Sequence, residues 1–210
     1  PNAFFSVQNV ICNGGNIITS NASDGLEPIT YEWLVDSDPF SIETNLNTVF
    51  NETSVPFGET SLTHDLILVV TDGNGCTDTA SNLITVSIPT AFPTYEFTGA
   101  AINSEGEYTC PPIFGTYVDS SFSYGSIQSW VWNFGNGNQS ILEDPSNTYA
   151  LPGTYSLTLS ITDSYGCTDD TVLVDYITVG GPSGDPSWFQ TPGECAQGAN
   201  FVMNDPVDIS

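Results

Sequence analysis

Apolar and polar residues alternate over many short stretches of this chain, and stretches with the 3.6-residue period of a helix are scarce. Residues 62–71 and 153–162 alternate in this way, and each leads through a Gly-containing turn into a further stretch, at 79–88 or 171–179. A strand, such a turn and a second strand predict a β-hairpin. Similar stretches predict strands at 3–7, 15–20, 29–35, 93–98, 112–118 and 127–134. The long polar region 36–61 predicts an inserted loop or extra edge strands.

The two predicted hairpins are copies of each other. The sequence DGNGCTDT at 72–79 returns as DSYGCTDDT at 163–171, 91 residues later. Such a period indicates tandem repeats. We predict three of them, the third represented only by its opening strands, at 1–90, 91–181 and 182–210. Repeats of about 90 residues built from short strands are typical of Ig-like β-sandwiches, so the expected fold is all-β, with tandem sandwiches arranged as a rod.

The composition supports packed cores in these repeats. Hydrophobic residues make up 39% of the chain and aromatic residues 12%. Trp33 and Trp132 each fall on the third predicted strand of a repeat, where an Ig-type sandwich often buries a tryptophan. We therefore expect both rings in the core. No apolar run reaches the length of a membrane span, so direct membrane insertion is not expected. Because the sequence starts at Pro1 without a signal-peptide pattern, we expect a mature or internal segment.

Each repeat has an early cysteine and a late one that follows a glycine. Cys12 and Cys76 are the pair of the first repeat, and Cys110 and Cys167 that of the second. Four cysteines allow three connectivities, and the repeat favours the one that stays within each repeat, Cys12 with Cys76 and Cys110 with Cys167. The alternative is buried free thiols. Cys195 stands where the early cysteine of a third repeat belongs, and either a late cysteine beyond Ser210 or an intermolecular bridge would pair it. Disulfides would place the chain outside a reducing cytosol.

The charge of the chain is entirely one-sided. There are 25 Asp and Glu residues and no Lys or Arg, for a net charge of −25. Nucleic-acid binding through phosphate contacts, docking on anionic membranes, and Arg-clamped or P-loop phosphoryl transfer all need basic side chains and are excluded. Ordinary salt bridges should be absent for the same reason. His64, the one histidine, lies beside Asp65 in a predicted strand and is expected on the surface.

The sequence contains few residues that could act in catalysis, but it contains several that could bind a cation. With one His and no Lys, most acid–base and nucleophilic schemes lack a base, so we predict no enzymatic activity. No cofactor is required, and Ca²⁺ is the one candidate ion, because it prefers carboxylate and amide oxygens. The alternative is an ordinary hairpin turn in which Asp caps the backbone. The candidate ligands lie in or just after the two turns: Asp72, Asn74, Asp78, Asp163, Asp169 and Asp170.

The second repeat resembles the PKD domain. WVWNFGNG at 130–137, DPSNTY at 144–149 and PGTYSLTL at 152–159 are similar to the WDFGDG strand end and the Y-x-x-PG-x-Y-x-V-x-L lead-in of that family. The resemblance implies an Ig-like sandwich. Asn133 and Asn136 stand where the family usually has Asp. The first repeat shares only its ending with the family and is a diverged copy.

The D-x-x-G-C-x-D ending is also similar to tandem repeats of giant surface proteins of gliding and filament-forming Bacteroidota. That resemblance implies type IX secretion and an extracellular or cell-surface location. It further implies O-glycosylation at Thr79 and Thr171, which both lie in an Asp-Thr-apolar pattern. The alternative for both residues is an ordinary strand threonine.

The sequence therefore predicts a non-catalytic structural repeat segment of a long secreted adhesin or extracellular filament. Its expected partners are further repeats or copies of the same protein, and surface glycans. The alternative is a carbohydrate-binding or spacer module of a secreted hydrolase, in which Trp130 and Trp188 would stack on sugars. The polypeptide beyond Ser210 discriminates the two, because more Cys-containing repeats there support the first and a catalytic domain supports the second.

Overall fold

The computed structural model describes residues 1–180 except 54, 57, 99–100, 103–107 and 110. The described residues form strands, turns and loops and contain no helix. They divide into two compact units. The first unit comprises residues 1–93, 120–131 and 159–171, and the second comprises 94–119, 132–158 and the described residues from 172 onward. The repeat boundaries expected at residues 90 and 181 stay predictions, and the third repeat lies outside the described residues.

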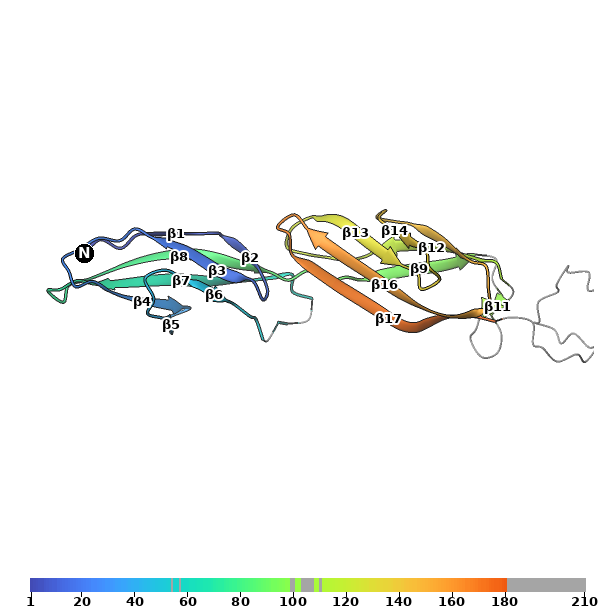
Figure 1. The fold of residues 1–210 in the computed structure, drawn as a ribbon, viewed down its shortest axis with the longest axis horizontal. Coiled ribbons are helices and arrows are strands. Elements are labelled where there is room, and N and C mark those ends of the chain that lie inside the picture. The colour runs from blue at the N-terminus through green and yellow to red at the C-terminus, as the bar shows by residue number, and fades with distance from the viewer. Residues whose placement is uncertain (54, 57, 99–100, 103–107, 110, 181–210) are drawn as a thin grey trace, which may run out of the picture. The chain divides into compact units, whose positions relative to one another are not determined.

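A long hairpin is the centre of the first unit (Figure 1). Its strands β7 (Ser61–Thr71) and β8 (Thr77–Ser87) pair in register from Ser61 opposite Ser87 to Thr71 opposite Thr77. They belong to a five-stranded sheet of order β2-β8-β7-β4-β5, in which β2 runs parallel to β8. The other strands of this sheet are β2 (Val10–Cys12), β4 (Thr30–Val35) and β5 (Asp38–Ser41). A three-stranded sheet contains β1 (Phe5–Val7), β3 (Asn16–Asn21) and β6 (Asn47–Val49), in the order β1-β3-β6.

The core of this unit collects side chains from both sheets. Phe5 of β1 and Ile17 of β3 pack in one buried cluster with Trp33, Leu66 and Ile84 of the five-stranded sheet. The Trp33 ring is fully buried and meets Phe5 edge-on, with ring centroids 4.9 Å apart. Its indole N–H donates a 2.7 Å hydrogen bond to the carbonyl of Glu43. The alternation along β7 is the cause of this arrangement, because every second side chain of a strand points to the same face.

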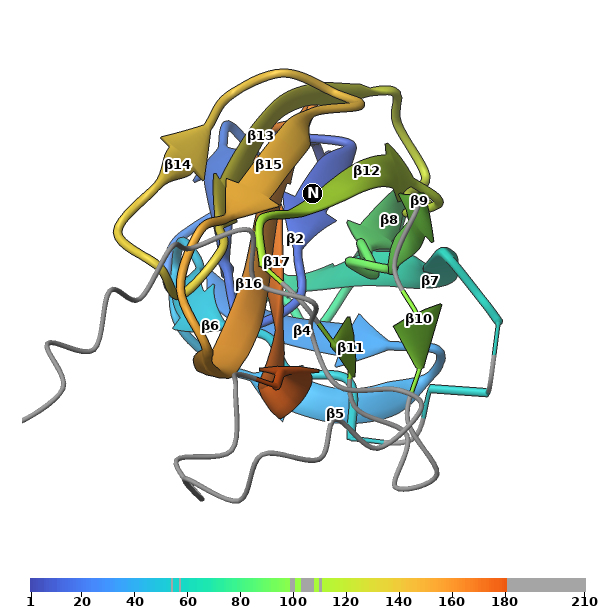
Figure 2. The same cartoon turned by 90° about the vertical axis from the view of Figure 1, so that its right-hand side faces the viewer.

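A six-stranded sheet and a three-stranded sheet contain the remaining strands. The six-stranded sheet has the order β10-β11-β17-β16-β13-β14, and the three-stranded sheet the order β15-β12-β9. Figure 2 shows β12 and β15 side by side, as their antiparallel register requires. Strands β13, β16 and β17 contribute residues to both compact units. The strand bounds are β9 (Pro93–Thr98), β10 (Ala101–Ile102), β11 (Tyr108–Thr109), β12 (Ile113–Asp119), β13 (Ile127–Asn133), β14 (Gln139–Ser140), β15 (Ser146–Tyr149), β16 (Gly153–Asp163) and β17 (Thr168–Val179).

Aromatic rings dominate the core of the second unit. Trp132 is fully buried and stacks on Phe134, with ring centroids 6.4 Å apart and 7° between the planes. The hydroxyls of Tyr117 and Tyr149 lie 2.9 Å apart, and that of Tyr149 donates to the carbonyl of Phe134. The expectation that Trp33 and Trp132 are core residues is therefore confirmed, and so is the all-β sandwich fold.

Candidate functional site

The turn between β16 and β17 is built by its D-x-x-G-C sequence. One carboxylate oxygen of Asp163, Oδ1, accepts hydrogen bonds from the backbone N–H groups of Tyr165 (2.8 Å) and Cys167 (2.9 Å). Gly166 has a φ of 82°, a left-handed conformation that glycine adopts at little cost. The β7–β8 turn repeats this geometry, with Asp72 capping Asn74 and Cys76 at 2.9 and 3.0 Å. The motif that marks the repeat therefore encodes a capped hairpin turn.

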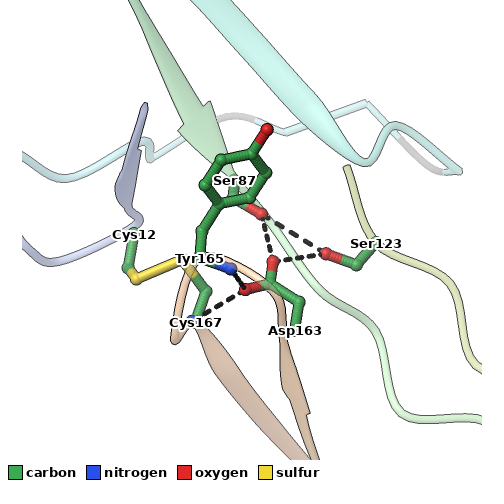
Figure 3. The surroundings of a disulfide bond; sticks show 6 residues. All are labelled: Cys12, Ser87, Ser123, Asp163, Tyr165 and Cys167. Atoms are coloured by element: carbon green, nitrogen blue, oxygen red, sulfur yellow. Dashed lines mark hydrogen bonds between the residues drawn. A yellow bond between two sulfur atoms is a disulfide. The ribbon is translucent and has the colours of Figure 1, made fainter. Parts of the chain in front are cut away.

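Cys167 of this turn is bonded to Cys12, which ends β2 (Figure 3). Their Cα atoms are 5.2 Å apart, and Cys167 is buried. Cys76 is an exposed free thiol. The predicted bonds Cys12–Cys76 and Cys110–Cys167 are therefore wrong; Cys110, like Cys195, lies outside the described residues.

The register of the first unit explains the error. Cys12 lies opposite Ser87, at the end of β8 that is farthest from the turn. Cys76 immediately precedes the other end of this 11-residue strand. At about 3.3 Å per residue the two ends are on the order of 30 Å apart. A disulfide needs Cα atoms within about 7 Å, so the early and late cysteines of the first repeat cannot meet.

The second oxygen of Asp163 connects the turn to two other segments of the first unit. Its Oδ2 accepts hydrogen bonds from the hydroxyls of Ser87 and Ser123, both at 2.7 Å (Figure 3). Burial of the carboxyl group opposes ionisation, but the hydrogen bonds from Ser123, Ser87 and the backbone outweigh it and hold the pKa of Asp163 below its ordinary value. The two serines have no distinguishing signal in the sequence.

Asp72 has a different outer partner. Its Oδ2 lies 3.6 Å from the amino nitrogen of Pro1, and only 8% of the Asp72 side chain is exposed. The pKa of Asp72 is also lowered, because the backbone hydrogen bonds from Cys76 and Asn74 and the charge of the amino group outweigh desolvation, the largest single effect. The two turns thus share their inner hydrogen bonds and differ in what the outer oxygen contacts.

The aspartates that come after the cysteines accept hydrogen bonds from backbone N–H groups of segments that are distant in the sequence. Asp78 accepts a 2.8 Å hydrogen bond from the N–H of Ala3, and Asp169 accepts one of the same length from the N–H of Ala91. These equivalent contacts fix the chain segments that enter the sandwiches. The hydrogen bond from Ala3 is the main cause that lowers the pKa of Asp78.

The six candidate calcium ligands do not form an assembled site. Four of the five carboxylates cap or clamp backbone, while Asn74 and Asp170 are exposed. Within the described part of the chain, no group of three or more His, Cys, Asp or Glu side chains is placed to hold a metal ion. The alternative of Asp-capped hairpin turns accounts for the pattern, and calcium binding stays a prediction.

The two threonines of the glycosylation pattern are not equivalent. Thr79 is exposed on β8. Thr171 is half-buried, and its hydroxyl donates a 2.6 Å hydrogen bond to the carbonyl of Ala91. A glycan on Thr171 would have to break this hydrogen bond.

His64 is not the surface residue that the sequence suggested. Only 16% of its side chain is exposed. Nδ1 lies 2.6 Å from Asp36 Oδ2, and Nε2 lies 2.7 Å from Glu52 Oε1. The ring of Phe50 meets the imidazole edge-on at 5.2 Å. His64, when protonated, and the amino group of Pro1 have acidic partners that need no Lys or Arg, so these contacts do not contradict the expected absence of ordinary salt bridges. The hydrogen bond from His64 is the first cause of a lowered pKa at Asp36.

Two further expectations concern sugars and membranes. Trp130 is half-buried, and Trp188, the other ring considered for sugar stacking, lies outside the described residues. No helix in the described ranges is long and apolar enough to cross a membrane.

Comparison with known proteins finds similarity over part of the chain. Residues 114–179 match the model of the PKD domain family, which confirms the resemblance of the second repeat. The pre-pro-metalloprotease PrtV of Vibrio cholerae is 44% identical over 59 residues, which are 27% of this chain and 6% of that protein. A microbial collagenase of Vibrio alginolyticus is 46% identical over 66 residues, 31% of this chain and 8% of that protein.

Solved structures of PKD domains are also similar. The PKD1 domain of Vibrio cholerae PrtV is 27% identical with a TM-score of 0.34, and the match covers 43% of this chain and 95% of that domain. The PKD1 domain of Vibrio anguillarum Epp is 25% identical with a TM-score of 0.34, and the match covers 45% of this chain and 98% of that domain. The matched residues thus span 6% of the metalloprotease and 8% of the collagenase.

Proposed function

We propose that this chain is a non-catalytic structural segment of a secreted protein, in which consecutive PKD-like repeats are joined covalently. The observation that carries the proposal is the bond between Cys12 of the first repeat and Cys167 of the second. Disulfides persist in oxidising compartments, which supports a location outside the cytosol. The finer form of the proposal is a cell-surface adhesin or extracellular filament exported by type IX secretion. Its partners would be further repeats or copies of the protein, and surface glycans.

The position of the bond suits a segment under tension. A force that pulls on the chain before Cys12 and after Cys167 passes through the disulfide and bypasses residues 13–166. Those residues therefore cannot be extended while the bond is intact, even if their strands separate. A stalk or filament gains from this arrangement, because a transient overload does not lengthen it.

Force spectroscopy tests the proposal directly. The chain is held by handles at its two ends and stretched with and without a reducing agent. We expect reduction to release an additional contour length of about 550 Å, from 155 residues at about 3.6 Å each. Cys12→Ser should behave like the reduced chain, and Cys76→Ser like the oxidised chain. Equal extension of the oxidised and reduced chains would refute the structural role.

A spacer module of a secreted hydrolase is the second candidate function. The similarity of part of the chain to a metalloprotease and a collagenase favours it. Sequencing of the polypeptide beyond Ser210 separates the two candidates. Further repeats with the D-x-x-G-C turn support the stalk or filament, and a catalytic domain supports the spacer.

A further inference from the structure

The second unit contains a cavity whose walls come from the turn before β14, from β15 and from β16. Its volume is about 460 Å³, within the range of about 300–1,000 Å³ that is usual for small-ligand sites. The polar side chains that line it are Asn136, Asn138, Thr148 and Tyr155. All of them fall within residues 114–179, so the cavity belongs to the part of the chain that matches the PKD domain family.

The charge of the cavity differs from that of the chain. None of the described side chains that line it is charged, although the chain has 25 acidic residues. A hard cation would need carboxylate ligands, which the lining does not contain. An anion would find no basic side chain, because the chain has no Lys or Arg. The cavity therefore suits a neutral ligand.

A hydrogen-bond network fixes the two asparagine amides. The backbone N–H of Asn138 donates to Oδ1 of Asn136 (3.1 Å), and Nδ2 of Asn136 donates to the carbonyl of Thr148 (3.0 Å). These contacts set the orientation of the Asn136 amide, because a backbone N–H can only donate and a carbonyl can only accept. Nδ2 of Asn138 donates at 2.7 Å to Oδ1 of Asn147, which is only 5% exposed. Both amides are thus held in place before a ligand binds, which lowers the entropic cost of binding.

The hydrogen-bonding groups that remain at the cavity wall are mainly acceptors. Among the described residues, neither Oδ1 of Asn138 nor the hydroxyl of Thr148 has a hydrogen-bond partner. The hydroxyl of Tyr155 donates its proton to the carbonyl of Leu151 (2.8 Å), so its oxygen can still accept. Hydroxyl groups of a ligand can donate to such acceptors, whereas carboxylates and phosphates that lack a proton cannot.

Aromatic rings provide apolar surface beside these groups. The ring of Tyr155 packs on that of the buried Tyr149, with centroids 4.6 Å apart, which restricts its movement. Phe114 lies directly opposite Thr148 on β12, so the two side chains share the outer face of this sheet. The Phe114 side chain is 46% exposed. A few polar groups placed beside aromatic rings are the usual construction of a small-ligand site.

We propose that this cavity binds a neutral oligosaccharide. A sugar ring offers both surfaces that the cavity requires, because its hydroxyl groups donate hydrogen bonds and its C–H faces pack on aromatic rings. Asn138 and Thr148 bind the hydroxyls of one sugar, and Tyr155 packs on its C–H face. Phe114 packs on the next sugar along the oligosaccharide. The inference rests on the proposed function, in which surface glycans are partners, and it gives those glycans a binding site.

An NMR titration of the full, isotope-labelled chain tests the inference. The probes are maltohexaose, cellohexaose and mannohexaose as neutral oligosaccharides, and a galacturonic acid hexamer as their anionic counterpart. We expect at least one neutral probe to cause saturable shifts of the backbone amides of residues 135–138, 148–151 and 155. The anionic hexamer should bind at least about tenfold more weakly, because its carboxylates donate no hydrogen bond and the chain is strongly acidic.

Three variants test the individual contacts. Thr148→Val removes the hydroxyl but keeps a branched, exposed side chain, and should weaken binding by about three- to tenfold. Ala150→Leu adds bulk to the cavity wall and should weaken binding by at least about tenfold. Thr48→Val is the matched control, because Thr48 is also an exposed strand threonine but lies on β6 of the first unit, and it should bind like the wild type. The amide spectrum of each variant shows whether it is folded.

The inference is overturned if no neutral probe causes saturable shifts at the cavity, or if the anionic hexamer binds as tightly as the neutral probes. It is also overturned if a folded Thr148→Val or Ala150→Leu binds as tightly as Thr48→Val. The proposed structural role is tested separately, because it depends on the Cys12–Cys167 bond and on force spectroscopy. A chain that binds no sugar can still gain length on reduction, and a chain that gains none can still bind sugar, so the two failures are distinguishable.

Discussion

The hydroxyl of Ser87, the last residue of β8, donates a 2.7 Å hydrogen bond to the carboxylate of Asp163, the last residue of β16. Both residues are buried, and the Cys12–Cys167 bond lies beside them (Figure 3). The polar contact and the covalent bond therefore hold the same turn from two sides, and each can be removed separately.

Asp163 should make the stability of the chain depend on pH. Its pKa is lowered in the folded state, so its stabilisation is fully present above the unfolded value of about 3.9 and is lost as the pH falls through the folded value. Asp163→Asn should reduce the free energy of unfolding at neutral pH by at least about 1 kcal/mol, since hydrogen bonds to a charged group are lost. Urea titrations at neutral and acid pH measure the difference between the two proteins.

That difference should shrink below about pH 4, where Asp163 becomes protonated in the unfolded chain and then in the folded one. The exposed Asp170→Asn serves as the control for lost charge and should differ little from the wild type at any pH. If the free energies of unfolding of Asp163→Asn and the wild type differed by the same amount down to low pH, this account would be wrong.

Removal of the disulfide should destabilise the chain strongly. The bond closes a loop with a sequence separation of 155 residues. In the chain-entropy model such a loop corresponds to about 5 kcal/mol in the free energy of unfolding. Cys12→Ser should lose most of this, and Cys76→Ser should stay within about 0.5 kcal/mol of the wild type. Urea unfolding of both variants decides between the observed connectivity and one within the first repeat, which would make the two variants equally unstable.

Trp132 should be essential for the second unit. The ring is fully buried, and its indole N–H donates a 3.0 Å hydrogen bond to the carbonyl of Leu142. Trp132→Ala should cost about 3–5 kcal/mol, from lost burial and the cavity that remains. The neighbouring Val131 is 48% exposed, and Val131→Ala should change the stability by less than about 0.5 kcal/mol. Thermal and urea unfolding monitor both variants, and a similar small loss in each would show that the ring is not a core residue.

His64 should control the ionisation of Asp36. His64→Gln removes the imidazole that is the first cause of the lowered Asp36 pKa, so that pKa should rise toward its ordinary value. Carboxyl-carbon NMR during a pH titration measures the change. Asp163 does not contact His64, so its pKa should remain where it is in the wild type. An unchanged Asp36 titration would mean that the backbone hydrogen bond from Asp65 alone sets its pKa.

Glycosylation, if it occurs in the native source, should distinguish the two threonines. The Thr79 side chain is exposed, whereas the Thr171 hydroxyl is bonded to the carbonyl of Ala91. We expect a glycan on Thr79 and a bare Thr171. Mass spectrometry of peptides from the native protein tests this, and a glycan found on Thr171 alone would contradict it.

Several strands could be predicted from the sequence because they are long and one-sided. The alternation at 62–71 and 153–162 corresponds to β7 and β16, and the turns after them contain a glycine and a capping aspartate. The very short strands β11 and β14 were not predicted, because two residues cannot show a period. The extra edge strands expected within 36–61 are β5 and β6.

The D-x-x-G-C sequence by itself determined the form of both turns, because the aspartate and glycine act on residues no more than four positions away. It did not determine which cysteines meet. That depends on the parallel pairing of β2 with β8, which places Cys12 at the end of the strand remote from Cys76. It also depends on Ser87 and Ser123, which meet Asp163 from segments far away in the chain. Residues that are close in the sequence determine the conformation of each turn, whereas the choice of a disulfide partner depends on which strand ends the tertiary structure brings together.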